Sequence, residues 1–564
     1  MLHPILDISN FNLVLSVIGL YILLFGFVSL KLKQRWYLGE ALPALLVGIA
    51  FGPIGAKYLN ISQWGGDDDN KNSEIAYGLT RLVIGIQLVK AGYELPKKYL
   101  KQRFKEMIIC LLPLMIISWI TTSACVKLLI PRVSYLSALI ISACVTCTDP
   151  VLSQAIAKGP FADNYVRRPL REFISAEAGG NDGFGFPLLL LGVSLLRYAE
   201  APANTLSLEV FDLERGVPDV LGTTGVGRFG GGAGTALKHW AVEGVLYMIF
   251  LGASYGAFVG FLCQKFLAKA LKRKWVDNES FTLVPVAIGL LAVGTCGCFG
   301  SDETLACFIA GCVLNWNGLY HEEIQARHDS FNSTIETILN FSVFMYLGAT
   351  MPWGQFQSPH TGITLWRLFG LSFMVLAFRR IPAILVGYRL MPKVCSDWKE
   401  ALFLGHFGPI GVGAISYVEY TRRLFPAPGQ SDREINNLTT SMVPVVYWLV
   451  LFSIVAHGLS VPALNALYRI FKVPRIYDHP VAVVLLSENE PLPNNCTMDR
   501  GRHSMIVNNR FSRPLESDSE TENKEDTAML RLSEEGPAEE RVERLSTQES
   551  TERAYRAVNT RGMV

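Results

Sequence analysis

The stretch VTCTDPVLSQAIA, residues 145–157, places Thr148, Asp149 and Pro150 inside an otherwise apolar run. Proline lacks a backbone donor and clashes with the preceding turn, so it interrupts a helix. A carboxylate at the same depth in a membrane costs about 2.5–3.5 kcal/mol on insertion scales, and it needs a partner or a function. Two interpretations stay open: a broken helix that binds a cation, or a structural proline kink in which Asp149 is hydrogen-bonded.

A second apolar run has a similar interruption. In GHFGPIGVGAIS, residues 405–416, four glycines and a proline lie within a predicted span. Two interrupted helices at corresponding positions of two halves are typical of inverted-repeat transporters, whose broken helices expose carbonyl and amide ends near the middle of the membrane. The residues expected to form the two breaks are Pro150, Gly408, Pro409 and Gly411.

The composition identifies an all-α polytopic membrane protein. Half of the 564 residues are hydrophobic and only 18% are charged, whereas soluble proteins carry about 25% charged residues. Apolar runs of about 20 residues recur along the chain, as in membrane helices. No phosphate-binding loop, metal-ligand set or nucleophile–base motif is found, so we expect neither an enzyme nor a cofactor, and the net charge of +2 gives no reason to expect a nucleic-acid partner.

The apolar pattern predicts about thirteen spans. With the seventh as a linker, spans 1–6 and 8–13 form two inverted repeats of six, and the broken spans are the fifth of each repeat. Most of the basic loops fall on one side, which puts the N-terminus outside and the C-terminus in the cytoplasm. The predicted spans are residues 11–30, 37–57, 76–95, 106–126, 135–157, 171–196, 240–264, 282–298, 303–316, 332–352, 364–391, 400–421 and 440–470.

Two polar segments flank these spans. Residues 201–239 are rich in glycine and are expected to form an external loop. From residue 478 to residue 564 the chain is charged and poor in aromatic residues, so we expect a disordered cytoplasmic tail, with regulatory proteins or kinases as candidate partners of its serines and threonines.

Two carboxylates follow in SAEAGGNDGFGFP, residues 175–187. Glu177 and Asn181 are four residues apart and share one helix face. Asp182 lies about 140° further round the helix from Glu177, so the two carboxylates need not share one role. An arginine of FRRIPAIL, either Arg379 or Arg380, can keep Glu177 ionised. Arg380 is preferred because it adjoins the Ile-Pro break.

This pairing leaves Asp182 to take up either a proton or a hard cation. Carboxylate, hydroxyl and carbonyl oxygens suit Na⁺ or Li⁺ and offer nothing to soft metals. His406, beside the second break, is a candidate pH-tuning residue or an ordinary buried histidine. Asp302 and Glu303 lie in a short turn, where a helix cap is the preferred interpretation.

These motifs together resemble the fungal plasma-membrane sodium/proton antiporters, a branch of the monovalent cation/proton antiporter superfamily. The resemblance covers about residues 10–470, from TDPVLSQAIAKGPFADNYVRRPLREFISAEAGGNDGFGFP to GHFGPIGVGAIS. It implies a homodimer with an NhaA-like antiporter fold. It further implies that Thr148, Asp149 and Asp182 line the Na⁺ site, with Asn181 beside them.

The resemblance also divides the chain into a scaffold and a moving core. Helices 1–3 of residues 1–105 belong to the scaffold, as do linker helix 7 and helices 8–10 of residues 240–362. Helices 4–6 of residues 106–200 and helices 11–13 of residues 363–477 form the core. The expected activity is exchange of cytoplasmic Na⁺, also Li⁺ and K⁺, for external H⁺ in the plasma membrane. A K⁺/H⁺ exchanger, a cation channel and an ion-sensing membrane scaffold are the alternatives.

Overall fold

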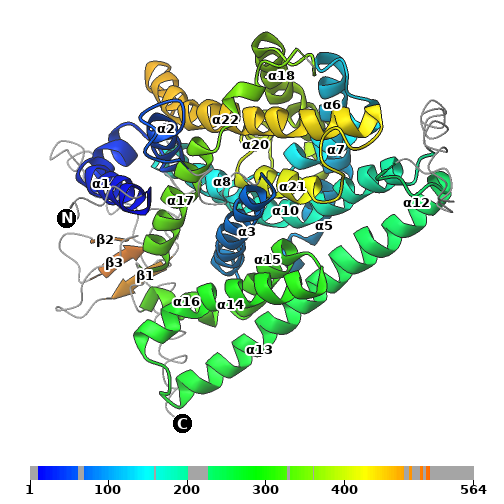
Figure 1. Ribbon diagram of the computed structural model, residues 1–564. Coiled ribbons are helices and arrows are strands. Elements are labelled where there is room, and N and C mark those ends of the chain that lie inside the picture. The colour runs from blue at the N-terminus through cyan, green and yellow to red at the C-terminus, as the bar shows by residue number, and fades with distance from the viewer. Residues whose placement is uncertain are drawn as a thin grey trace, which may run out of the picture. The chain divides into compact units, whose positions relative to one another are not determined.

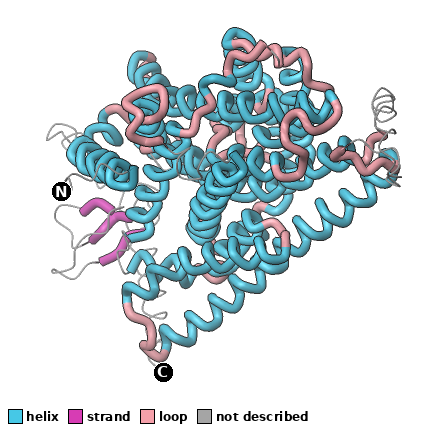
Figure 2. The backbone as a smooth tube through the Cα atoms, viewed as in Figure 1, coloured by secondary structure: helices cyan, strands magenta, loops and turns pink. Residues whose placement is uncertain are grey.

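The computed structural model describes residues 10–60, 69–157, 160–200, 226–326, 331–359 and 361–474, together with three short strands between residues 482 and 507. Almost all of this described part is helical (Figure 2). Contacts divide the chain into residues 1–513 and 514–564, and the second unit lies outside the described residues.

Each predicted span coincides with a helix or with consecutive helical segments, which confirms the all-α polytopic fold. Within the described residues, eight helical stretches are long and apolar enough to cross a membrane. The unbroken helices are α1 (Asn10–Leu30), α2 (Ala41–Phe51), α3 (Asp69–Glu94), α10 (Arg168–Arg197), α14 (Asn278–Phe299), α15 (Glu303–Leu314), α17 (Phe331–Ala349) and α22 (Arg433–Ile470).

Three spans are interrupted near their middle. The first break separates α7 (Tyr135–Thr146) from α8 (Pro150–Ala157), and the second separates α20 (Trp398–His406) from α21 (Val412–Arg422). A third break separates α18 (Leu365–Phe378) from α19 (Ile381–Gly387), where a proline occupies the first turn of α19. Because proline cannot donate a backbone hydrogen bond, each restart after a proline leaves carbonyl groups for other partners.

Several spans contain π-helical turns that the apolar pattern did not predict. The first is η1 (Lys31–Arg35), which continues α1. One span consists of α5 (Phe104–Ile109), η3 (Cys110–Leu114) and α6 (Met115–Leu129), and η3 contains a proline. The linker consists of α12 (Gly232–Trp240), η6 (Ala241–Leu251) and α13 (Gly252–Lys272). The short helices are α4 (Tyr99–Gln102), α9 (Pro160–Tyr165), α16 (Leu319–Ala326), η7 (Trp353–Gln355) and η8 (Tyr388–Leu390).

The linker contacts two different parts of the fold. Its first half, α12 and η6, packs against α10, while α13 runs along α15 (Figure 1). At Gly256 and Gly260 of α13, an added Cβ would lie 2.3 and 2.5 Å from the carbonyl oxygens of Ala306 and Ala310. Small residues at this spacing let two membrane helices approach closely. The linker is therefore held tightly against α15 over its second half.

The structure corrects the two predicted polar segments. The Gly-rich loop ends earlier than residue 239, because good helix formers after the glycines start α12 at Gly232; residues 201–225 lie outside the described part. The tail is not without secondary structure, since β1 (Ala482–Leu485), β2 (Cys496–Met498) and β3 (Ser504–Val507) form an antiparallel sheet in the order β1-β3-β2. The reason is local, because β1 lies in an apolar, valine-rich run that favours strand pairing.

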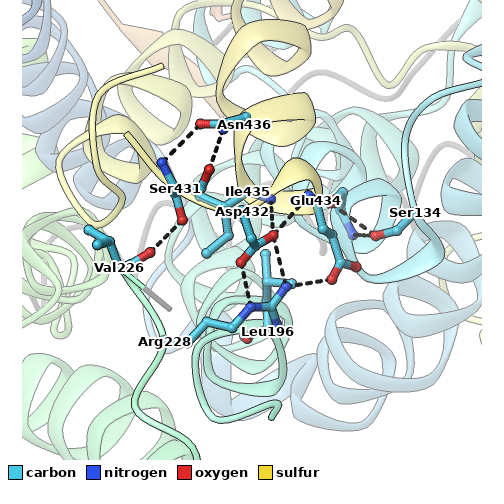
Figure 3. A network of polar contacts seen from close by, with 10 residues as sticks. Ser134, Leu196, Val226, Arg228, Ser431, Asp432, Glu434, Ile435 and Asn436 are labelled. Atoms are coloured by element: carbon cyan, nitrogen blue, oxygen red, sulfur yellow. Dashed lines mark hydrogen bonds and ion pairs between the residues drawn. The ribbon is translucent and has the colours of Figure 1, made fainter. Parts of the chain in front are cut away.

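A buried ion pair holds the segment before α12 in place (Figure 3). Arg228 donates to both carboxylate oxygens of Asp432, at 2.7 and 3.3 Å, and to Glu434 at 2.7 Å. It also donates to the carbonyl of Leu196 in α10, at 3.1 Å. Asp432 caps the start of α22 by accepting from the backbone N–H groups of Glu434 and Ile435. The contacts fix the end of α10, the segment before the linker and the start of α22 to one another.

We predict that Arg228→Leu lowers the stability of the protein, because the side chains of Arg228 and Asp432 are each only 1% exposed. Breaking one member of a buried pair typically costs about 3–5 kcal/mol. Thermal unfolding in detergent measures the loss, and Arg433→Leu is the matched control because Arg433 is exposed. Equal melting temperatures for the two variants would contradict the prediction.

The pH dependence of this stabilisation follows from Asp432. Burial alone raises the pKa of this carboxyl, but the hydrogen bonds and charge of Arg228 together with the backbone N–H groups hold the pKa below its ordinary value. A depressed folded-state pKa gives stability that is present above the unfolded value, about 3.9, and lost as the pH falls through the folded value. The difference in melting temperature between the parent and Arg228→Leu should thus stay constant from pH 7 to pH 5 and shrink below about pH 4.

Candidate ion-binding site

The first two interrupted spans pack against α10, the helix that carries Glu177, Asn181 and Asp182, through α7, α8 and α20. The third break reaches α10 through the hydrogen bonds of Arg380 to Glu177. All three of these α10 side chains are buried. The fold therefore brings together, at one level, the two breaks and the carboxylates that the sequence singled out. Each charged group at this level has a distinct set of partners.

Asp149 joins the two crossing breaks. Its Oδ1 accepts from the N–H of Leu152 at 3.0 Å, and its Oδ2 accepts from the N–H of Val412 at 2.5 Å. Its own N–H donates to the carbonyl of Pro409 at 2.9 Å. One carboxylate thus caps the N-terminal ends of both α8 and α21, where the partial charge of a helix is positive. This geometry favours the structural interpretation of Asp149, in which the carboxylate is hydrogen-bonded.

Arg379 donates hydrogen bonds to the C-terminal ends of the helical segments, opposite to the N-terminal ends that Asp149 caps. Its guanidinium donates to the carbonyls of Val145, Thr146 and Cys147 at the end of α7, at 2.8, 3.0 and 3.2 Å. It also donates to the carbonyl of Gly408 in the second break. A fixed positive charge therefore lies where the unsatisfied carbonyls give a negative partial charge. In this arrangement Arg379 does not pair with Glu177.

The glycines of the second break are required by close approach. A Cβ at Gly411 would lie 2.1 Å from Oδ2 of Asp149, and one at Gly408 would lie 2.5 Å from Cδ of Arg380. A Cβ at Gly413, in the first turn of α21, would lie 2.9 Å from Oδ1 of Asp182. Any larger residue would push these charged side chains out of place.

Glu177 pairs with Arg380, the arginine that the sequence preferred. Arg380 donates to both carboxylate oxygens, at 2.7 and 2.9 Å, and its Nε donates to the carbonyl of Leu404. Asn181 donates to Glu177 at 2.6 Å and to the hydroxyl of Thr148 at 3.3 Å. The i, i+4 contact expected between Glu177 and Asn181 is therefore present. Glu177 is fully engaged by these two side chains.

Asp182 differs from all of these groups. Its side chain is buried, with the residue only 1% exposed, and neither carboxylate oxygen has a hydrogen-bond partner among the described residues. The Oδ1 of Asn181 is buried without a partner as well. An isolated buried carboxylate is costly unless it holds a proton or a cation. The carboxylate oxygens of Asp182 and the amide oxygen of Asn181 therefore all lack hydrogen-bond partners among the described residues.

Two polar residues near Asp182 were not identified from the sequence as belonging to this site. Tyr417 donates its hydroxyl to the backbone carbonyl of Asp182. Asp302 caps α15 through the N–H groups of Thr304 and Leu305, as expected for a helix cap. Its other oxygen is buried without a partner, and a Cβ added at Gly183 would lie 3.1 Å from it. The sequence predicted that Asp302 caps a helix. It did not predict that α15 lies close to α10.

Within the described ranges, no hydrogen bond or ion pair joins the His406 side chain to an acidic residue. Its Nε2 lies 3.1 Å from the hydroxyl of Ser460. A second histidine, His457, was missed by the sequence analysis although it lies four residues after Ser453 on one helix face. Ser453 accepts from the N–H of Ile410 in the break at 2.7 Å and lies 3.1 Å from Nδ1 of His457, whose Nε2 contacts the carbonyl of His406 at 2.9 Å. These contacts fix the second break to α22.

Comparison with known proteins identifies the family. The profile of the family described as "Sodium/hydrogen exchanger, transmembrane" matches residues 18–466. A probable Na⁺/H⁺ antiporter of Schizosaccharomyces pombe is 35% identical over 466 residues, covering 81% of this chain and 56% of the relative. A Na⁺/H⁺ antiporter of Saccharomyces cerevisiae is 31% identical, covering 81% and 44%. Another S. pombe Na⁺/H⁺ antiporter is 32% identical, covering 81% and 91%. The match thus spans about half the length of the first two relatives.

The fold is similar to that of a solved antiporter. The structure of the sodium proton antiporter MjNhaP1 from Methanocaldococcus jannaschii at pH 8 superimposes with a TM-score of 0.57 and covers 82% of this chain and 99% of that chain. The sequence identity is 13%, so the similarity concerns the fold. It supports the predicted antiporter architecture.

We predict strong energetic coupling between Glu177 and Arg380 and none between Glu177 and Arg379. Glu177→Gln or Arg380→Gln leaves one buried charge unpaired and should cost about 3–5 kcal/mol, while the double substitution recovers much of the loss. Double-mutant cycles on the melting temperature measure both couplings. Additive effects for Arg380 would show that the ion pair does not stabilise the fold.

A steric prediction tests the contact at Gly411. Gly411→Ala places a methyl group against the carboxylate of Asp149 and should lower both stability and any transport. Gly294→Ala, in α14, is the control because a Cβ there meets nothing within 4 Å. Thermal unfolding of both purified variants compares the two positions, and an unchanged melting temperature for Gly411→Ala would contradict the close approach.

Proposed function

The chain belongs to the sodium/hydrogen exchanger family, and we propose that it exchanges cytoplasmic Na⁺ for external H⁺ by competition at Asp182. The observation that carries this proposal is the pair of unpartnered oxygens on a fully buried carboxylate. Such a group is stable in a membrane only when it is neutralised, by a proton or by a cation. Proton and cation therefore exclude each other at one place.

The neighbouring residues divide the remaining tasks. Asp149 and Arg379 compensate the helix ends at the crossing, so these ends need no ion. Glu177 forms a buried ion pair with Arg380, which removes it from the competition. Asn181 precedes Asp182 in the chain, and its amide nitrogen bonds to the hydroxyl of Thr148. The amide and hydroxyl oxygens of these two residues are neutral, and hard cations such as Na⁺ and Li⁺ bind this type of ligand.

Exchange then follows from the cost of an empty site. A core that carries ionised Asp182 without a cation would expose a bare charge to the membrane interior, so it moves only when loaded. In this proposal the helices of residues 106–200 and 363–477 move as the core between the two membrane faces. The remaining helices form the scaffold of a homodimer in the plasma membrane, with the N-terminus outside and the C-terminus in the cytoplasm.

Potassium exchange is the closest alternative, because oxygen ligands serve both ions. A cation channel has less support, since a conducting pore requires a filter or rings of charge along an open path. At the crossing of the breaks, the charged side chains are bonded to the helix ends. The transport measurement below separates these possibilities.

Asp182→Asn should abolish sodium-driven proton movement while leaving a folded protein, because the substitution keeps the size and removes the titrating charge. The assay is proton movement in vesicles that contain the purified protein, on addition of Na⁺, Li⁺ or K⁺. Glu279→Gln, which removes an exposed carboxylate, is the control. Full activity of Asp182→Asn would refute the assignment. Cation currents without obligatory proton movement would indicate a channel, and a response to K⁺ alone would indicate a potassium exchanger.

A further inference from the structure

A dense basic cluster follows α3 and continues into the first turn of α5. In KKYLKQRFK, residues 97–105, four lysines and one arginine occur within nine residues and no acidic residue interrupts them. The side chains of the four lysines are exposed, and Arg103 is partly buried. None of the five forms an ion pair with any residue that the structure describes. We call Lys97, Lys98, Lys101, Arg103 and Lys105 the basic loop.

The backbone holds the basic loop in a defined shape. Tyr99 is buried and anchors the short helix α4. The N–H groups of Tyr99, Gln102 and Arg103 donate to the carbonyls of Pro96, Lys98 and Tyr99, at 3.1, 3.0 and 2.9 Å. The positive charges are therefore presented together by an ordered segment, which lowers the entropic cost of binding a ligand.

The position of the loop determines which ligand it meets. The membrane-crossing helical stretch Phe104–Leu129 begins within the basic loop, and Phe104 is itself 60% exposed. An exposed aromatic residue at the start of a span is suited to the interface between hydrocarbon and headgroups. The lysines beside it then lie at headgroup level, where the available counter-charges are lipid phosphates and carboxylates.

We propose that the basic loop is a binding surface for anionic phospholipid headgroups in the leaflet that it faces. Clusters of four to eight lysines and arginines next to a membrane helix bind anionic lipids, and each charge strengthens the interaction about fivefold. The positive-inside pattern puts this loop at the cytoplasmic leaflet, which carries the anionic lipids. Lipid binding by the loop does not depend on which ions the protein transports.

The test is the melting temperature of the purified protein in neutral detergent micelles with and without added phosphatidylserine. We expect phosphatidylserine to raise the melting temperature of the parent, and to raise it much less for K97Q/K98Q/K101Q/K105Q. The corresponding lysine-to-arginine variant should keep the effect, because it keeps the charges. The matched control is K57Q/K71Q/K127Q/K238Q, which removes four exposed lysines from four separate segments on the predicted external side and should also keep it.

Three outcomes would overturn the proposal. They are an undiminished response in the glutamine variant of the basic loop, an equal loss in the control with four scattered lysines replaced, and equal stabilisation of the parent by inorganic phosphate. The last outcome would indicate a general anion site. Because the measurement involves no transport, loss of the proposed exchange activity in Asp182→Asn would neither support nor weaken this inference.

Discussion

Two helices that break in the middle of a membrane leave four helix ends without backbone partners, and water is absent there to satisfy them. This protein meets that constraint with one carboxylate and one guanidinium. Asp149 accepts hydrogen bonds from the N–H groups at the starts of α8 and α21. Arg379 donates hydrogen bonds to the carbonyls at the end of α7 and in the second break. The two breaks can cross only because these opposite charges match the opposite helix ends.

Because the neighbouring charges are matched by protein groups, Asp182 is the carboxylate left without a partner at this level among the described residues. Glu177 is neutralised by Arg380 and Asp149 is satisfied by backbone amides, so both have their charge matched within the protein. Asp182 packs against the first turn of α21, and no donor from the described part of the chain is bonded to its oxygens. In the function proposed here, the unmatched charge is the one that moves ions, and the matched charges hold the surroundings of that site in place.

Long-range contacts connect this centre with the rest of the fold. The α12–η6 half of the linker lies against α10, which carries Asp182, while α13 lies against α15 (Figure 1). Arg228 ties the segment before the linker to the ends of α10 and α22 (Figure 3). A displacement of α10 would therefore be transmitted to the linker.

The sequence by itself determined the helical spans, the two crossing breaks and the shared face of Glu177 and Asn181, because apolar runs, prolines and i, i+4 spacing act locally. It also predicted the family and narrowed the partner of Glu177 to two arginines. Only the tertiary structure decided that Arg380 makes the pair, that Asp149 caps a helix 263 positions away, and that Asp302 approaches α10. These contacts depend on which helices pack together and at what rotation, and no local periodicity encodes that.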